Sequence, residues 1–187
     1  MRLFVLRHAE RAADDATFAS PLLPQGEATA AALATTLAAD HPRFTHVYTS
    51  PFLRCVQTLA PYCAATTART VRVDNALYEW IRGDAGHDPT HHQRAWPWGT
   101  HPHLDAHLDA SYASWWPLAA IPYDESEEAM RTRVRAFRAH LEEVHSPDDV
   151  VLLVTHLSAI NALLHRADEA PFAMGHCQEL PPPPSAV

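Results

Sequence analysis

Short apolar runs with no polar alternation recur along this chain and separate segments that have helical spacing. The runs lie at residues 3–6, 46–50, 71–74 and 150–155. Strands that are buried on both faces of a parallel sheet have this pattern. The segments between them predict helices over residues 25–40, 51–63, 127–144 and 158–165. Strands that alternate with helices indicate an α/β fold, a three-layer α/β/α sandwich with a mostly parallel central sheet.

The segment at residues 127–144 carries the clearest helical pattern. Its apolar residues follow one another at spacings of three and four, as on the buried face of a helix: Met130, Val134, Phe137 and Leu141. Ser126 is a predicted N-cap, because a serine hydroxyl can accept a hydrogen bond from a free N–H of the first turn.

The chain has 187 residues, enough for one domain over residues 1–180, followed by a Pro-rich tail at residues 181–187. The longest apolar runs are too short for a signal peptide or a membrane span. Cys55 and Cys63 lie eight residues apart on one predicted helix, and the rise of about 12 Å between them exceeds disulfide reach. With an odd total of three cysteines, this predicts reduced thiols and a cytoplasmic protein.

The positive side chains of the formal charge count are all arginines, since the sequence contains no lysine. Fourteen arginines against 22 acidic residues give a net charge of −8. Such a chain does not hold nucleic acid or an anionic membrane by bulk attraction. Schiff-base and P-loop lysine chemistry are excluded. Arginine instead suits two-pronged recognition of phosphate or carboxylate.

Basic side chains stand where the predicted strands end. Arg7 and His8 follow the first strand. Arg54 lies one turn into the helix after the second strand, and His156 follows the fourth. The carboxyl ends of parallel strands lie at one edge of a sheet, and ligands gather there. We therefore expect two histidines and two arginines from remote parts of the chain to meet at this edge.

Such a cluster suits phosphoryl transfer. Guanidinium groups bind phosphate oxygens in bidentate fashion, and a helix N-terminus adds backbone donors. An imidazole among them can attack phosphorus in line and form a phosphohistidine. The leaving oxygen needs a proton donor, and Glu79 stands just beyond the third strand. The flanking Tyr78 and Trp80 predict a desolvated carboxyl with a raised pKa, as a general acid needs.

Four sequence elements, in order, resemble those of a known family. They are LRHAER at residues 6–11, PL and a later glycine within residues 21–26, SPFLRCVQT at residues 50–58, and Thr155-His156. The set is similar to the Arg-His-Gly-Glu signature and the later motifs of the histidine phosphatase superfamily, also called phosphoglycerate mutase-like. Ala9 replaces the family's usual glycine, which raises the question whether this position needs a backbone conformation that alanine avoids.

The resemblance implies a phosphoglycerate mutase-like fold and a site without metal or cofactor. It implies that His8 is the nucleophile and that Glu79 donates the proton. It also implies a set of phosphate-binding residues: Arg7, His8, Arg54 and His156. Within the superfamily, Arg11 resembles a further arginine that lines the phosphate site of the suppressor of T-cell receptor signalling phosphatases and the ecdysteroid-phosphate phosphatases.

Residues 81–123 show no clear period and are predicted to form a lid, an excursion over one end of the sheet. Within them, residues 87–116 are rich in histidine and tryptophan. His103 and His107 have the i, i+4 spacing of two residues that share a metal ion. Because prolines interrupt regular structure there and cysteine is absent, we expect no metal and a segment that faces solvent or a bulky leaving group.

These observations favour a phosphatase that hydrolyses a phosphomonoester through a phosphohistidine on His8. The expected substrate is a phosphorylated small molecule or a phosphopeptide, with no nucleic acid and no membrane as partner, and a homodimer stays open. Two alternatives also stay open. One is mutase-type phosphoryl transfer, although the chain is short for the insertions that close mutases. The other is a non-catalytic transcription-factor subunit that binds phosphorylated partners on the same fold.

Overall fold

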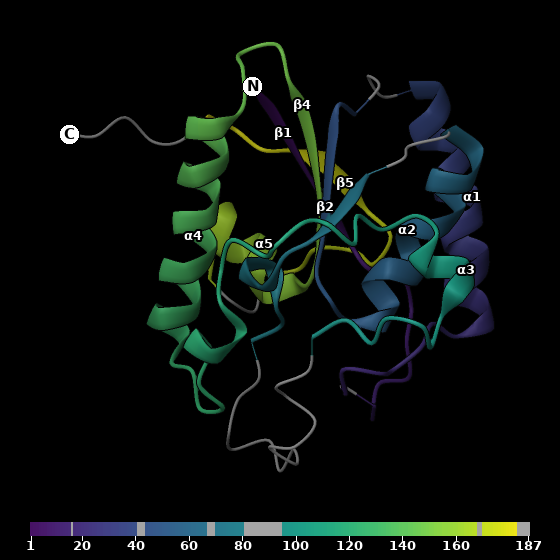
Figure 1. Ribbon diagram of the computed structural model, residues 1–187, viewed down its shortest axis with the longest axis horizontal. Helices are drawn as coiled ribbons and strands as arrows, with labels where there is room; N and C mark the ends of the chain where they lie inside the picture. The colour runs from purple at the N-terminus through teal and green to yellow at the C-terminus, as the bar shows by residue number, and fades with distance from the viewer. Residues whose placement is uncertain (16, 41–43, 67–69, 81–94, 168–169, 183–187) are drawn as a thin grey trace.

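The computed structural model describes residues 1–187 except residue 16 and residues 41–43, 67–69, 81–94, 168–169 and 183–187. Its strands are β1 (Arg2–Arg7), β2 (His46–Thr49), β3 (Val71–Val73), β4 (Val150–Thr155) and β5 (Cys177–Glu179). They form one sheet in the order β3-β2-β4-β1-β5 (Figure 1). The first four strands are parallel, and β5 pairs antiparallel with β1.

Helices cover both faces of this sheet (Figure 1). One face carries α1 (Pro24–Asp40) and α2 (Leu53–Thr66), and the other carries α4 (Glu127–Val144) and α5 (Leu157–Leu163). The predicted α/β fold with a mostly parallel sheet is therefore confirmed. The described parts of the connections contain the short helical turns η1 (Asn75–Leu77), α3 (Pro102–Asp105) and η4 (Leu118–Ala120). Among the described helices, none has the length and apolar content to span a bilayer.

The bounds of the elements follow the predictions where the apolar pattern is strong. α4 and β4 have the predicted limits, and the Ser126 hydroxyl caps α4 by accepting a hydrogen bond from the Ala129 N–H. α2 begins at Leu53, two residues later than predicted, and α5 ends at Leu163. β5 was not predicted, because its three residues form no apolar run.

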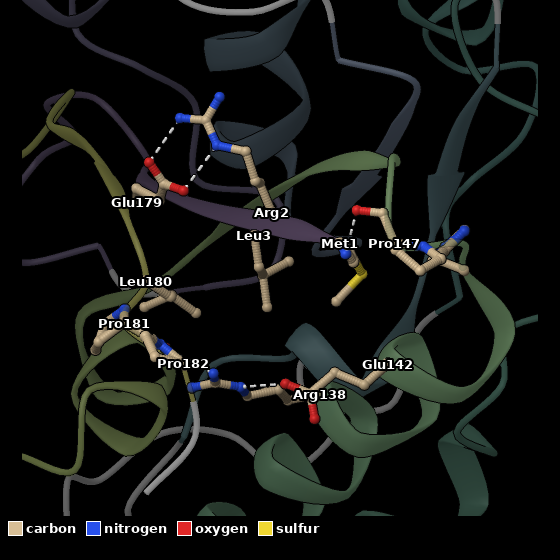
Figure 2. Close-up of a pocket in the computed structure, with 11 residues that line it drawn as sticks. Met1, Arg2, Leu3, Arg138, Glu142, Pro147, Glu179, Leu180, Pro181 and Pro182 are labelled. Atoms are coloured by element: carbon tan, nitrogen blue, oxygen red, sulfur yellow. Dashed lines mark hydrogen bonds and ion pairs between the residues drawn. The ribbon is translucent and has the colours of Figure 1, made fainter.

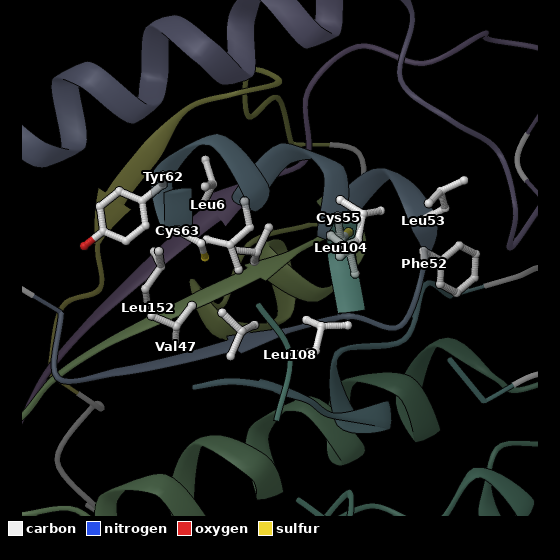
Figure 3. Packing of buried hydrophobic residues seen from close by; sticks show 14 of the residues in the cluster. Leu6, Val47, Phe52, Leu53, Cys55, Tyr62, Cys63, Leu104, Leu108 and Leu152 are labelled. Carbon is white, nitrogen blue, oxygen red and sulfur yellow. The ribbon is translucent and has the colours of Figure 1, made fainter. Parts of the chain in front are cut away.

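The hydrophobic core lies in two layers because alternate residues of a strand point to opposite faces of the sheet. Leu6 and Leu152 pack with α1 and α2 in one layer (Figure 3). Val5 and Leu153, the neighbouring residues in each strand, pack with Phe137 of α4 in the other. This two-sided burial explains why the strands read as unbroken apolar runs.

Residues 95–108 are part of the predicted lid. They pack beside the sheet, whereas the sequence predicted a segment that faces solvent or a leaving group. Trp96, Leu104 and Leu108 are buried in the same layer as α2. Leu108 also forms a β-bridge with Val71 at the edge strand β3. Covering this edge removes apolar surface and free strand groups from water. Residues 81–94, with three of the histidines considered above, lie outside the described residues.

All three cysteines are free thiols, as the spacing of Cys55 and Cys63 predicted. Burial raises the pKa of the Cys55 and Cys63 thiols to about 12. Buried thiols with raised pKa values are poor nucleophiles at neutral pH, so both side chains pack in the core, where Cys55 Sγ also lies 3.6 Å from Nε2 of His156.

Candidate active site

Two histidines meet at the carboxyl ends of the central strands. β1 and β4 are adjacent and in register, with Arg7 beside Thr155. His8 and His156 therefore each take the first position after their strand. The His8 N–H donates to the Thr155 carbonyl at 3.0 Å, and the two imidazole centres lie 5.3 Å apart. Both side chains are buried.

A backbone carbonyl sets the position of the hydrogen on the His8 ring. Nδ1 of His8 lies 2.8 Å from the Ala9 carbonyl oxygen. A carbonyl only accepts hydrogen bonds, so Nδ1 carries the hydrogen and Nε2 keeps its lone pair. Burial lowers the pKa of His8 well below its ordinary value, and the nearby His156 and Arg54 lower it further. The ring is therefore neutral at pH 7, with Nε2 as its nucleophilic atom.

The loop after His8 is held by two close contacts. The Ala9 N–H donates to the Thr58 hydroxyl at 2.9 Å. Ala9 has no left-handed backbone conformation, since His165 is the only non-glycine residue with positive φ in the described part of the chain. Alanine thus fits here without strain. Gly26 of α1 lies against the Glu10 backbone so closely that a Cβ would collide with it, which explains the glycine of that motif.

Arg54 lies in the first turn of α2 and is fully buried. Its Nη1 donates to the Thr17 carbonyl at 2.9 Å. Its Nη2 lies 3.4 Å from a Glu79 carboxylate oxygen and 3.4 Å from Nδ1 of His156. The guanidinium also packs over the Phe52 ring, 4.5 Å from its centre. These contacts fix a positive charge beside both histidines.

His156 has a partner at each ring nitrogen. Nδ1 lies 3.0 Å from the Glu79 carboxylate, and Nε2 lies 2.8 Å from the Ser50 hydroxyl. A carboxylate accepts, so Nδ1 donates to Glu79 and Nε2 accepts from Ser50. Burial is the largest cause that lowers the pKa of His156, to about 4. This ring is also neutral at pH 7.

A buried ion pair positions the turn that presents Glu79. After β3 the chain forms η1 and then reaches Glu79. Arg133 of α4 donates to the Ala76 carbonyl in this turn at 2.8 Å. The same guanidinium binds both Glu125 carboxylate oxygens, at 2.9 and 2.6 Å. Arg133 is fully buried, so α4 fixes the backbone that leads to Glu79.

The sequence-based expectation of a raised Glu79 pKa is wrong in this structure. Burial does raise the pKa of Glu79, but His156, Arg54 and His8 lower it by more. The Ser158 hydroxyl also donates to Glu79, at 2.8 Å. The aromatic neighbour Trp80 bonds to a backbone carbonyl and leaves the carboxylate to these polar groups. Glu79 is therefore ionised in the structure described.

Arg7 and Arg11 flank this cluster. Arg7 donates through Nη1 to the Phe172 carbonyl, and Arg11 donates through Nη1 to the Ala12 carbonyl and, at 3.0 Å, to that of Asp15. The structure therefore brings His8, Arg54, Glu79 and His156 into one cluster, while the direct contacts of Arg7 and Arg11 are with nearby backbone.

The three predicted phosphate-binding arginines share one unusual feature. Each has a buried Nε with no hydrogen-bond partner among the described residues: Arg7, Arg11 and Arg54. A buried donor without a partner is costly, and native proteins rarely leave one without a reason. Three such N–H groups on arginines that lie near the ends of β1 and β2 are what a site for a multivalent oxyanion would present.

Sequence reasoning missed several residues that shape the site. Ser50 lies within a recognised motif but had no assigned role, and Ser158 stands two residues after His156. Both could have been suspected from their place beside functional residues. Arg133 could not, because its effect on Glu79 depends on a contact of α4 with the Ala76 turn across the fold.

His8, Glu79 and His156 also form a group whose ligand atoms lie within 4.8 Å of one another. A metal ion there would compete with existing contacts. Both ring nitrogens of His156 are engaged, and the Arg54 guanidinium lies 3.4 Å from both Glu79 and His156. A fixed positive charge at that distance repels a cation and attracts an anion.

The fold and this cluster define an α/β protein whose site presents two neutral histidines and fixed guanidinium groups at the carboxyl edge of a parallel sheet. More narrowly, the chain belongs to the histidine phosphatase superfamily (branch 1), whose family model matches residues 3–184. Among curated proteins, none matches the chain.

Solved structures share the fold at low sequence identity. The ecdysone phosphate phosphatase of Bombyx mori, in complex with tungstate, is 18% identical with a TM-score of 0.61 and covers 100% of this chain and 94% of that chain. The mycobacterial glucosyl-3-phosphoglycerate phosphatase with VO3 is 24% identical with a TM-score of 0.62, covering 95% and 90%. With inorganic phosphate, it is 26% identical with a TM-score of 0.59, covering 89% and 80%.

Proposed function

We propose that this protein is a metal-independent phosphatase that hydrolyses a phosphomonoester through a phosphohistidine on His8. The observation that carries the proposal is the neutral His8 ring, with its lone pair on Nε2, beside three arginines that each keep an unpartnered buried Nε–H. Membership of the superfamily and the phosphatases of similar fold support it. The cytoplasmic location stays a prediction.

Binding in this proposal uses donors that are already in place. Arg7, Arg11 and Arg54 donate their free Nε–H groups to the phosphoryl oxygens, and the charge of each guanidinium strengthens these bonds. His156 adds a further contact when the bound dianion draws a proton onto Nε2 and the Ser50 hydroxyl turns away, while Nδ1 goes on donating to Glu79. Donors that are fixed before the substrate arrives cost little reorganisation, and removal of one such donor typically slows catalysis by about 10²–10³-fold.

In the first step, Nε2 of His8 attacks phosphorus and a new N–P bond forms. The bond between phosphorus and the ester oxygen breaks, and its electron pair goes to that oxygen. Glu79 supplies the proton that this oxygen needs. Glu79 is ionised before binding, but a phosphate dianion placed between it and the arginines raises its pKa, because like charges disfavour ionisation. The carboxylate then takes up one proton from solvent as the substrate binds, and this is the proton that it passes to the leaving oxygen.

In the second step, Glu79 has returned to the carboxylate form and accepts a proton from water. The water oxygen attacks phosphorus, the N–P bond breaks, and its electron pair returns to Nε2 of His8. Inorganic phosphate leaves, and the neutral ring is restored. Nδ1 keeps its hydrogen and donates it to the Ala9 carbonyl throughout, so the ring keeps one orientation in both steps.

The alcohol part of the substrate is not specified by these residues. The two relatives are named for phosphate esters of different alcohols, ecdysone and a glucosylated phosphoglycerate. They support the reaction type and a substrate with a bulky leaving group. Phosphorylated small molecules and phosphopeptides are thus both suitable for a first screen.

The direct test is hydrolysis of p-nitrophenyl phosphate in EDTA by the wild type, by His8→Ala, and by His103→Ala as a matched control at an exposed histidine. We expect activity in the wild type and the control, and loss of activity in His8→Ala. Equal activity in wild type and His8→Ala would refute the assignment of His8 as the nucleophile. Loss of wild-type activity in EDTA, while circular dichroism shows that the protein stays folded, would refute the metal-free mechanism.

The same preparation separates hydrolysis from mutase chemistry. Phosphohistidine formed on the enzyme should decay to inorganic phosphate at the rate of turnover, whether or not 3-phosphoglycerate is added. Fast transfer to added phosphoglycerate with slow hydrolysis would establish a mutase. Binding of phosphopeptides with no turnover of any ester would establish the non-catalytic alternative.

A further inference from the structure

A second group of metal-ligand side chains lies at the amino ends of the strands, away from the cluster around His8. His46 begins β2, His145 directly follows α4, and Asp149 directly precedes β4. Nε2 of His46 lies 3.4 Å from Asp149 Oδ1, and Nδ1 of His145 lies 3.7 Å from Asp149 Oδ2. These ligand atoms all lie within 4.8 Å of one another.

We propose that His46, His145 and Asp149 bind one divalent transition-metal ion of the zinc type. Two imidazoles and one carboxylate are a donor set that Zn²⁺ favours, with water or another ligand in a fourth position. Tetrahedral coordination with bonds of about 2.0–2.2 Å places ligand atoms about 3.4 Å apart. The separation of His46 Nε2 and Asp149 Oδ1 already has this value.

Direct hydrogen bonding does not account for this arrangement. N–H···O bonds in proteins are about 2.7–3.2 Å long. Both histidine nitrogens lie farther than that from the Asp149 oxygens. The two rings also face each other, with centres 4.1 Å apart. Both nitrogens therefore point at the carboxylate across a gap that an ion would close.

The candidate ligands are held by outer contacts. The Ser146 N–H donates to Asp149 Oδ2 at 2.8 Å, and the Thr45 hydroxyl donates to Oδ1 at 3.2 Å. Nε2 of His145, the nitrogen away from the carboxylate, lies 3.1 Å from the Tyr48 hydroxyl. Contacts of this kind orient metal ligands, and their loss typically lowers metal affinity by about 10–100-fold.

One positive charge lies near the group and opposes a cation. Arg72 Nη1 lies 3.5 Å from Nδ1 of His46, the ring's other nitrogen. Coordination through Nε2 leaves the hydrogen on Nδ1, so this long contact must open. Arg72 already has a shorter contact, 2.9 Å to the Tyr48 hydroxyl, and its guanidinium packs over the Tyr48 ring. It therefore keeps a partner when the ion binds.

Solvent can reach this group. The side chains of His46 and Asp149 are 27% and 21% exposed. His145 also lines a cavity of about 370 Å³ whose walls include Met1, Glu142 and Pro147 (Figure 2). The other charged side chains that line this cavity form pairs, Arg2 with Glu179 and Arg138 with Glu142, and the Met1 ammonium donates to the Pro147 carbonyl (Figure 2). They leave the histidine–aspartate group free to take the ion.

An ion here would join the start of β2 to the short connection between α4 and β4, a segment remote from β2 in sequence. Because it binds only the folded arrangement, it would stabilise the fold rather than take part in catalysis. Sequence reasoning considered metal only within residues 87–116 and missed this group, since about a hundred residues separate His46 from its two partners.

The test uses the full chain, freed of metal with EDTA and desalted, and titrated with ZnCl2 in a calorimeter. We expect one binding event in the wild type and a rise in unfolding temperature with Zn²⁺. His46→Gln and Asp149→Asn should each weaken this event by at least about tenfold, because each removes a ligand. Circular dichroism checks that each variant is folded. If only one variant folds, that variant alone is enough to test whether a ligand has been removed.

Two controls locate the ion. His8→Gln removes a ligand from the other histidine group, and His103→Gln removes an exposed histidine of the His-rich segment. Both should keep the event seen in the wild type. The proposal is overturned if the wild type binds no Zn²⁺, or if folded His46→Gln and Asp149→Asn bind it as tightly as the wild type does.

Discussion

At the scale of single residues, the site is organised by which atoms hold hydrogens. The Ala9 carbonyl fixes the hydrogen of His8 on Nδ1, and Glu79 fixes that of His156 on its Nδ1. Both rings are neutral at pH 7 because burial lowers their pKa values. One ring can therefore act as a nucleophile while Arg54 supplies the positive charge that the phosphoryl group needs.

Replacing the proton donor gives a test at this scale. In Glu79→Gln, hydrolysis of an alkyl phosphate should slow by about 10²–10⁴-fold, because an alkoxide is a poor leaving group without a proton. Nitrophenolate needs little protonation, so p-nitrophenyl phosphate should lose much less rate. Steady-state rates on both esters measure the difference. Equal losses on the two esters would rule out Glu79 as the donor.

At the scale of elements, the carboxylate depends on a turn that α4 fixes through the buried Arg133–Glu125 pair. Arg133 also donates to the Ala76 carbonyl of η1, two residues before Tyr78. A buried pair of this kind is costly to break, because the remaining charge stays in the protein interior without a partner. The precision of the Glu79 position is therefore tied to the stability of α4 packing.

Arg133→Met should lower the free energy of unfolding by about 3–5 kcal/mol, since it leaves Glu125 buried and unpaired. Arg2→Met is the matched control, because Arg2 makes a similar bidentate pair with Glu179 at an exposed position. It should change the free energy of unfolding far less, because water and salt screen an exposed ion pair. Urea unfolding measures both values. Similar losses of unfolding free energy in the two variants would show that the buried pair contributes no more to stability than the exposed pair.

Sequence patterns predicted the elements that carry strong periodicity and missed those that depend on tertiary contacts. The first and last residues of α4 and β4 were predicted correctly, because buried apolar residues mark both elements and the Ser126 cap marks the start of α4. β5 was missed because three partly buried residues leave no pattern. The Glu79 pKa was predicted in the wrong direction, because the neighbours in sequence are aromatic whereas the neighbours in space are basic.

At the scale of the whole molecule, the sheet separates two different chemistries. The carboxyl ends of the strands carry His8, Arg54 and His156, a local positive site in a chain of net charge −8. The amino ends carry His46 and Asp149, which suit a cation. Net charge therefore governs long-range attraction to other molecules, whereas the fixed charges at each end of the sheet determine which ion can bind there.

Stability should fall as the solution becomes acidic. The folded-state pKa of His156 is about 4, and that of His8 lies well below the ordinary value of 6.5. Between pH 6.5 and about 4 the unfolded chain therefore binds more protons, so stability decreases as pH falls through this window. Each such histidine contributes a slope of about 1.4 kcal/mol per pH unit.

Urea unfolding at several pH values measures this slope. His156→Gln should show a shallower dependence than the wild type over the same window, because one buried neutral imidazole is gone. The ionised Glu79 acts in the same direction only at lower pH, as its depressed pKa keeps it charged until then. An unchanged slope in His156→Gln would contradict the assignment of a buried neutral ring.

The central claim is that a phosphoryl group passes through Nε2 of His8, and trapping that intermediate tests it most directly. The enzyme is mixed with a phosphomonoester, quenched in denaturant at alkaline pH, digested and examined by mass spectrometry. We predict an acid-labile phosphoryl group on the peptide that contains His8, formed by the wild type and by Glu79→Gln and absent from His8→Ala. Turnover of the ester by the wild type with no phosphoryl group on His8, or with one on another residue, would contradict the account.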